Sequence, residues 1–230
     1  MVTLVLLPGM DGSGAMFAGF IAALGDGITP LVLSYPTDQI LSYDGLADFA
    51  RTRLPAGQPY VLLGESFSGP VAIALAAECP AGLVGLVLSC TFARNPVSLF
   101  QHCAPLIALL PVSSRLSGLA LPLLLGRHAT PALRMTLRAA LDRLRPAVLR
   151  ARMRAVLGVD CSAQLGRIAV PVLYLQAAQD RVVSSASGRL IASLLPSVTV
   201  AVVRGPHLLL QTAPEQTAVL VREFIDQTGR

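Results

Sequence analysis

The sequence predicts an α/β fold with a doubly wound, mainly parallel six-stranded sheet that has helices on both faces. Six short runs of apolar residues recur along the 230-residue chain, and segments of helical length separate most of them. The runs are apolar at consecutive positions rather than at alternate ones, which indicates strands buried on both faces. Alternation of such strands with helices is typical of a parallel sheet covered on both sides.

The expected strands are short and rich in leucine and valine. They cover residues 2–7, 30–34, 60–64, 84–89, 171–176 and 198–203. The expected helices cover residues 15–24, 43–54, 70–79, 185–195 and 214–227. In a parallel sheet the loops that follow the strands meet at one edge, and functional residues of such folds collect there.

The alternation stops between the fourth and the fifth expected strand. Residues 94–167 carry no strand signal, whereas Leu, Arg and Ala recur there at helical spacing. We therefore expect a helical cap inserted into a core made of residues 1–93 and 168–230. Because a cap lies over the loops that form the site, we expect it to select the substrate.

The basic residues of the chain, apart from histidine, are all arginines. Nine of them lie between Arg115 and Arg154, with Asp142 as the single acid in that stretch. A solvated helix face is the ordinary explanation. A docking surface for an acidic acyl-carrier protein or coenzyme A is the alternative, with Arg138, Arg145 and Arg152 as the residues expected to contribute. Aromatic residues are not interleaved with the arginines, so we expect no nucleic-acid partner.

Composition also bears on location and cofactors. The chain starts without a basic segment, and its first apolar run ends at Pro8, so no secretory signal is expected. Residues 104–125 are rich in leucine but contain Arg115 and three prolines, which disfavours a transmembrane segment. The four cysteines lack C-x-x-C spacing, as expected for reduced thiols in a cytoplasmic protein. No ligand cluster suggests a metal, and we expect no cofactor.

One stretch joins a strand directly to a helix. The apolar run 60–64 ends at Gly64, the chain passes through Ser66, and a helical segment follows from Gly69. A turn this tight strains the backbone of its middle residue and needs small neighbours, here Gly64 and Ser68. Ser66 should therefore project freely, beside the amide of Phe67 at the start of a helix.

This stretch resembles the G-x-S-x-G nucleophile elbow of the α/β-hydrolases, with Ser68 at the second glycine. The resemblance implies that Ser66 is a nucleophile. The glycine-rich loop 8–14 resembles the loop that donates an amide to the oxyanion hole, which would join Met10 to Phe67 as donors. A flexible turn is the alternative interpretation of that loop.

The same resemblance implies the other two members of a catalytic triad. Asp180 lies on the loop after the fifth strand and matches the family's acid; the alternative is a surface aspartate that caps the next helix. His207 follows the last strand, where the family carries its base. The order Ser66, Asp180, His207 is that of the family, although the leading antiparallel hairpin is missing. His102 and His128 belong to the inserted region and are not candidates.

The resemblance implies a serine carboxylesterase that cleaves small to medium acyl esters through an acyl-serine intermediate. An acyl thioesterase or esterase acting on carrier-linked substrates is one alternative, which the arginine-rich stretch favours. A non-catalytic ligand-binding receptor on the same fold is another. Dehalogenase and epoxide-hydrolase activities are disfavoured, because those relatives carry aspartate at the position of Ser66.

Overall fold

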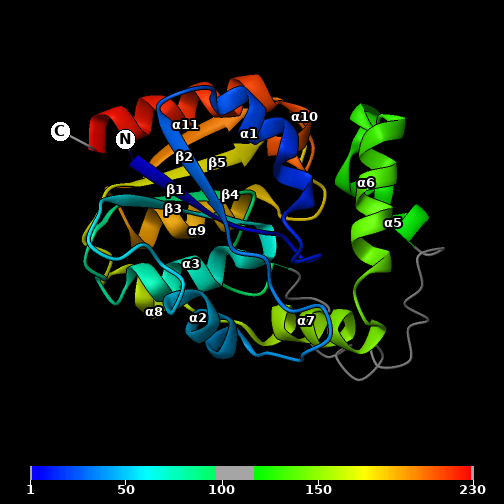
Figure 1. Cartoon of the computed structure of the whole chain (residues 1–230), viewed down its shortest axis with the longest axis horizontal. Helices are drawn as coiled ribbons and strands as arrows, with labels where there is room; N and C mark the ends of the chain where they lie inside the picture. Colours follow the sequence, from blue (N-terminus) through cyan, green and yellow to red (C-terminus); the bar gives the residue numbers. More distant parts are fainter. Residues whose placement is uncertain (1, 97–116, 229–230) are drawn as a thin grey trace.

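The computed structural model describes residues 2–96 and 117–228, and its centre is a single six-stranded sheet (Figure 1). The strands are ordered β2-β1-β3-β4-β5-β6, and every neighbouring pair is parallel. Their bounds are Val2–Leu7 for β1, Ile28–Val32 for β2, Tyr60–Glu65 for β3, Leu83–Ser89 for β4, Val172–Ala177 for β5 and Thr199–Val203 for β6. The predicted fold class is confirmed, and the strand order reverses between β1 and β3.

Helices cover both faces of this sheet (Figure 1). One face carries α1 (Ala18–Leu24), which follows the 3-10 turn η1 (Ala15–Phe17), and α11 (Pro214–Thr228), with the short α10 (Leu209–Thr212) beside them. The other face carries α2 (Tyr43–Arg51), α3 (Gly69–Ala76), α8 (Ser162–Leu165) and α9 (Ser185–Leu194). Each layer is amphipathic or apolar toward the sheet, as burial of both sheet faces requires.

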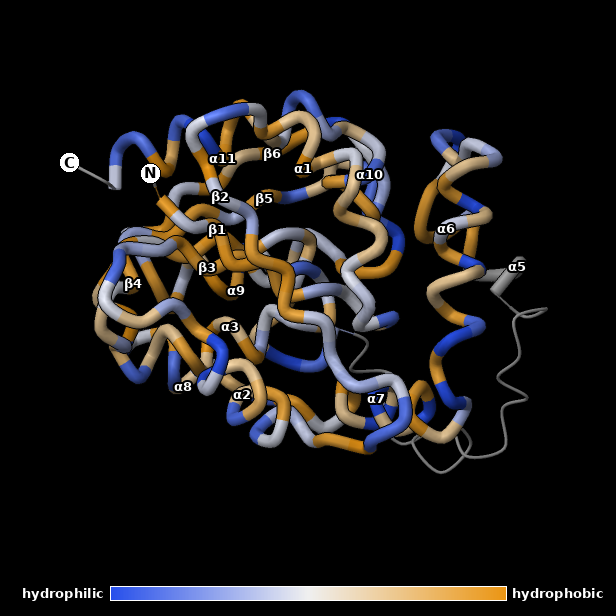
Figure 2. Tube along the Cα trace, viewed as in Figure 1, coloured by the Kyte–Doolittle hydropathy of each residue, from blue (hydrophilic) through white to orange (hydrophobic). Residues whose placement is uncertain are grey.

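Alternate residues of the strands separate the core into two clusters. In β1, Leu4 packs in the cluster that contains Phe224 of α11, whereas Val5 packs in the cluster that contains Val71 of α3. Figure 2 shows the hydrophobic residues gathered along the central strands. Because each strand is buried on both sides, its sequence has no polar alternation, which is why the apolar runs were continuous.

The element bounds differ from expectation mainly at β2, α2 and α3, and α2 ends at Arg51 rather than at Leu54. β2 begins two residues earlier than predicted, because it pairs with β1 from Ile28 opposite Val2 to Val32 opposite Leu6. It lies at the edge of the sheet and includes Pro30, which an edge strand tolerates because only one of its sides is paired. α3 ends at Ala76 rather than at Cys79, whose φ of 51° is incompatible with continuing the helix.

Four elements between β4 and β5 lie near the carboxyl ends of the strands. They are α5 (Ser117–Leu124), η4 (Gly126–His128), α6 (Pro131–Asp142) and α7 (Pro146–Gly158), and Figure 1 shows the three helices beyond that edge of the sheet. Leu125 and Leu137 form a small separate core with Met16 of η1 and Leu208. α8, further along the chain, packs against α3 and α9 instead. The boundaries of a cap at residues 94 and 167 stay a prediction.

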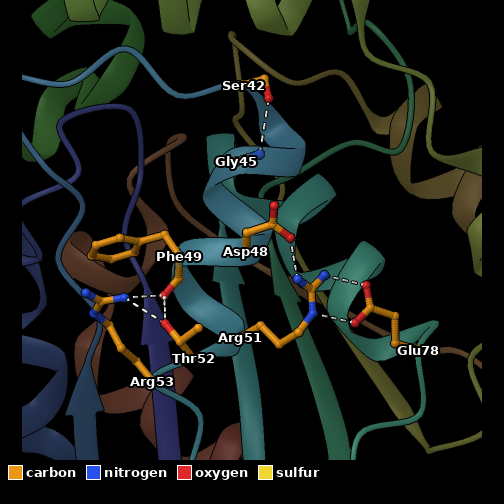
Figure 3. A network of polar contacts seen from close by, with 8 residues as sticks. All are labelled: Ser42, Gly45, Asp48, Phe49, Arg51, Thr52, Arg53 and Glu78. Carbon is orange, nitrogen blue, oxygen red and sulfur yellow. Dashed lines mark hydrogen bonds and ion pairs between the residues drawn. The ribbon is translucent and has the colours of Figure 1, made fainter.

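A polar network joins α2 to the chain that follows α3 (Figure 3). Arg51 donates to both carboxylate oxygens of Glu78, at 2.8 and 2.6 Å, and also pairs with Asp48 one turn earlier. At the start of the helix, Ser42 accepts a hydrogen bond from the amide of Gly45 at 3.1 Å. These ion pairs are exposed, so they orient the helices more than they stabilise them.

Within the two described ranges, no helix combines the length and apolar character needed to cross a bilayer. Most of the leucine-rich stretch 104–125, together with His102 and Cys103, falls outside those ranges. Cys79, Cys90 and Cys161 are free thiols.

Candidate active site

Ser66 lies on the turn that joins β3 to α3, in a strained conformation. Its φ is 49°, in the left-handed region, at a cost on the order of 1–3 kcal/mol for a residue with a side chain. The approach of the helix leaves no room beside Gly64: a Cβ there would lie 2.7 Å from that of Ala72 and 2.9 Å from the carbonyl oxygen of Ser68. The sharp turn therefore depends on glycine at position 64.

The second close approach is at Gly69, one residue later than the family pattern suggests. A Cβ at Gly69 would lie 1.8 Å from Oγ1 of Thr91, on the loop after β4. The same hydroxyl of Thr91 donates a hydrogen bond to the carbonyl oxygen of Ser66. The position that has no room for a side chain is therefore Gly69, and position 68 can carry a serine.

The structure brings together the three residues predicted to form a triad. Ser66 Oγ lies 2.8 Å from Nε2 of His207, and Nδ1 of His207 lies 2.8 Å from Oδ2 of Asp180. The side chains of His207 and Asp180 are only 2% and 5% exposed, whereas Ser66 is half-buried. The three residues follow β3, β5 and β6, whose carboxyl ends meet at one edge of the sheet.

Asp180 is fixed by the backbone of its own loop. Its Oδ1 accepts hydrogen bonds from the amides of Val182 and Val183, both at 2.8 Å, which leaves Oδ2 for His207. An ionised carboxylate accepts here and cannot donate, so Nδ1 of His207 carries the proton that it shares with Asp180. Nε2 is then the acceptor that faces the hydroxyl of Ser66.

The loop after β1 forms a tight turn that contains Met10. The Gly12 amide donates to the carbonyl oxygen of Gly9 at 3.0 Å, and the Tyr35 amide donates to that of Gly12 at 2.7 Å. Among the described residues, the Met10 amide has no acceptor. Since the carbonyl of the same peptide unit is bonded to Gly12, this amide points away from the turn. That orientation supports the oxyanion role, which stays a proposal for both Met10 and Phe67.

Phe67 follows Ser66 and has a buried side chain. Its ring stacks on that of Tyr43, with centroids 5.0 Å apart. The ring thus fixes the elbow against α2, while the backbone amide of Phe67 belongs to the first turn after the nucleophile.

The serine at position 68 connects the elbow to the loop after β1. Its hydroxyl is fully buried and donates to the carbonyl oxygen of Pro8. Because Ser68 has a single hydroxyl proton, the phenol of Tyr35, 2.8 Å away, must donate to Ser68 Oγ. Burial raises the pKa of Tyr35, so the phenol keeps the proton that this bond needs. Sequence reasoning did not find this link.

Glu65, directly before the nucleophile, also holds that loop. Its carboxyl group is 3% exposed, accepts a hydrogen bond from Nε2 of Gln211 at 2.9 Å and lies against the backbone of Gly9. Burial, aided by the nearby charge of Asp11, raises the pKa of Glu65 to about 7. Gln211 is distant from Glu65 in the chain, and the sequence carries no signal for their contact.

Arg152 of α7 was predicted to lie on an arginine-rich surface, and this prediction is wrong. Its side chain is 2% exposed, because α7 points it inward against the loops after β1 and β2. Arg138 and Arg145 are exposed, as expected. His128 is half-buried in η4. Among the described residues, no group of three His, Cys, Asp or Glu side chains could hold a metal ion.

Comparison with known proteins identifies the family. The model of the alpha/beta hydrolase family matches residues 4–220, and the chain belongs to this family. No match is found among the curated proteins.

Solved structures with the same fold have low sequence identity to this chain. An esterase from Thermogutta terrifontis in a malate-bound form has a TM-score of 0.86 at 19% identity, covering 99% of this chain and 90% of its own. The enol-lactonase from Burkholderia xenovorans LB400 has a TM-score of 0.83 at 17%, covering 98% and 91%. The bromoperoxidase from Bacillus anthracis has a TM-score of 0.81 at 15%, covering 98% and 92%. These likenesses show the fold, which hosts different reactions.

Proposed function

We propose that the protein is a serine hydrolase that cleaves carboxylic esters through an acyl-Ser66 intermediate. The observation that supports this most is the continuous chain from Ser66 Oγ through His207 to Asp180, with both hydrogen bonds at 2.8 Å. The two partners of the nucleophile are buried, whereas Ser66 itself is partly accessible. A substrate can therefore reach the hydroxyl without solvating the acid that orients the base.

In the proposed mechanism, the hydroxyl of Ser66 attacks the ester carbonyl while Nε2 of His207 accepts its proton. Asp180 holds the imidazole and stabilises its charged form. The new oxyanion accepts hydrogen bonds from the amides of Met10 and Phe67, each worth about 3–4 kcal/mol in comparable sites. The C–O bond to the alcohol then breaks, and His207 returns the proton to the leaving oxygen.

The acyl-enzyme is hydrolysed by the reverse sequence of proton transfers. Water replaces the alcohol, loses its proton to His207 and attacks the acyl carbonyl of Ser66. Collapse of the second tetrahedral intermediate releases the carboxylic acid and restores the Ser66 hydroxyl. The groups of the chain that this cycle uses are the base, the nucleophile and the proposed oxyanion donors, and they lie on loops at one sheet edge.

The exposed arginines support a second candidate, hydrolysis of an acyl group linked to an acidic carrier. Arg134, Arg138, Arg143 and Arg145 are exposed on α6 and on the turn that follows it. The single acid of this surface, Asp142, lies 4.0 Å from Arg138. A positively charged surface next to the site would attract an anionic carrier. Arg152 has no part in this surface.

Turnover of a series of p-nitrophenyl esters, from acetate to decanoate, tests the proposal. The wild-type protein should hydrolyse at least the shorter members, and Ser66→Ala should lower kcat on the order of a million-fold. Ser193→Ala, on the exposed side of α9, is the matched control and should keep wild-type turnover. A Ser66→Ala protein as active as that control would overturn the assignment, and a wild-type protein inactive on all esters would favour a receptor.

A further inference from the structure

Arg152 is a buried cation that contacts the proposed oxyanion loop from α7. Its Nη1 donates to the carbonyl oxygen of Met10 at 2.9 Å, and its Nη2 donates to that of Pro36, on the loop after β2, at 3.0 Å. The guanidinium carbon lies 5.6 Å from the ring centroid of Tyr35 and 5.9 Å from that of Phe67. Both rings belong to residues that hold the elbow.

This guanidinium has no carboxylate partner within ion-pair distance among the described residues. Burial lowers the pKa of Arg152, although the nearby Tyr35 and Asp11 oppose that effect. A binding site for a substrate anion would need an accessible guanidinium, but this one is 2% exposed and both terminal nitrogens donate to backbone carbonyls. Its contacts are therefore with the protein's own loops.

One of these contacts borders the peptide unit between Gly9 and Met10, which carries the Met10 amide. On the preceding side, the backbone of Gly9 lies against the carboxyl group of Glu65. On the following side, the Met10 carbonyl accepts from Arg152. The carbonyl of the unit itself accepts from the Gly12 amide. Two hydrogen bonds and the contact with Glu65 thus surround the unit and leave only its amide, the proposed oxyanion donor, without a partner among the described residues.

Only one of these three restraints comes from an element outside the sheet and its own loop. We infer that Arg152 is a positioning residue: its guanidinium, carried by α7, fixes the Met10 peptide in the orientation that stabilises the oxyanion. A shift of α7 would withdraw the guanidinium and release the Met10 carbonyl. Formation of the oxyanion hole therefore depends on the position of α7 relative to the loop after β1. This inference rests on the proposed function.

Gly12 explains why the guanidinium sits close to this turn. A Cβ at Gly12 would lie 2.4 Å from Nη1 and 2.9 Å from Nη2 of Arg152, and the φ of Gly12 is 72°. The turn therefore has a glycine where the guanidinium approaches the backbone most closely. A larger residue at position 12 would displace Arg152 from Met10.

The test compares Arg152→Met, which keeps an apolar stem but no donor, with Arg152→Lys, which keeps the charge but cannot reach two carbonyls with a planar fork. Arg154→Met, exposed on the same helix, is the matched control. Active sites are titrated with a fluorophosphonate, and kcat per titrated site, KM and the Ki of an alkyl trifluoromethyl ketone are measured. That ketone forms a tetrahedral adduct with an oxyanion, so its Ki reports on the oxyanion hole.

We expect kcat per site and affinity for the ketone to fall together by about 10- to 100-fold in the Arg152 variants, with KM within about threefold. A merely structural role would lower the number of titratable sites and the unfolding midpoint, but would leave kcat per site and Ki unchanged. If Arg152→Met does not fold, Arg152→Lys decides. The inference is overturned if every folded Arg152 variant matches Arg154→Met in kcat per site and Ki. A wild-type protein that takes neither probe nor ester overturns the proposed function instead.

Discussion

Replacing Gly69 with alanine should damage the elbow through one contact. The new Cβ would lie 1.8 Å from Oγ1, 2.5 Å from Cγ2 and 2.6 Å from Cβ of Thr91. Ordinary contact begins near 3.4 Å, so Gly69 and Thr91 must separate by about 1.6 Å. Both residues are buried, which prevents an escape toward solvent. Overpacking of this kind typically costs about 1–3 kcal/mol of unfolding free energy.

The same displacement should lower turnover, because Thr91 Oγ1 donates to the carbonyl oxygen of Ser66. A misplacement of about 1 Å can cost about 100-fold in rate. The assay is kcat per fluorophosphonate-titrated site together with urea unfolding, for Gly69→Ala and for the double variant with Thr91→Ala. The second substitution removes the two nearest clashing side-chain atoms, so the double variant should be destabilised by less than the sum of the two single variants.

Gly19→Ala is the control for the glycine replacement itself. Gly19 lies in α1, and a Cβ there would meet nothing within 4 Å. Alanine should stabilise this helix by about 0.5–1 kcal/mol without changing kcat. If Gly69→Ala behaves like Gly19→Ala in both assays, the packing argument for the elbow is wrong.

The remaining predictions concern the acid, the buried carboxyl group and the charged surface. Asp180→Asn should lower kcat by about 10⁴-fold, since it disfavours the tautomer of His207 that accepts the serine proton; unchanged turnover, measured on p-nitrophenyl esters, would move the role to another acid. Because the folded-state pKa of Glu65 is raised to about 7, its contribution to stability is present at low pH and lost as the pH rises through that value. The free energy of unfolding in urea should therefore fall for the wild type relative to Glu65→Gln between about pH 4.5 and 7, by on the order of 1–3 kcal/mol, and parallel pH profiles would contradict this. Charge reversal at Arg143 and Arg145, or added salt, should lower kcat/KM for an acyl-carrier substrate but not for a neutral ester, because the screening length is about 10 Å at 0.1 M salt; equal responses would leave the arginines as a solvated surface.

The order of strands and helices could be predicted from the sequence because the central strands are buried on both faces. Their side chains are apolar at consecutive positions, as in Val61, Leu62 and Leu63, all fully buried. The apolar pattern is weaker in β2, at the edge of the sheet, because this strand is partly exposed and contains Pro30. Its start was therefore predicted two residues late. There the register with β1, rather than local composition, sets the bounds of the strand.

The three residues of the proposed triad could be predicted from the sequence, because their positions relative to the strands can be read along the chain. Ser66, Asp180 and His207 each follow a strand, and parallel strands bring such positions to one edge. The supporting contacts could not be predicted in this way. Ser68, Tyr35 and Arg152 meet through tertiary packing, and no sequence signal separates the buried Arg152 from the exposed Arg154 two positions later.

The most direct test of the account is the site of covalent labelling by a fluorophosphonate probe. Mass spectrometry of the labelled, digested protein should find a single modified peptide that carries the probe on Ser66, because among residues 2–96 and 117–228 only this serine is bonded to a histidine that can accept its proton. Labelling should disappear in Ser66→Ala and slow sharply in His207→Gln. Modification of another serine, or labelling that persists in Ser66→Ala, would contradict the account.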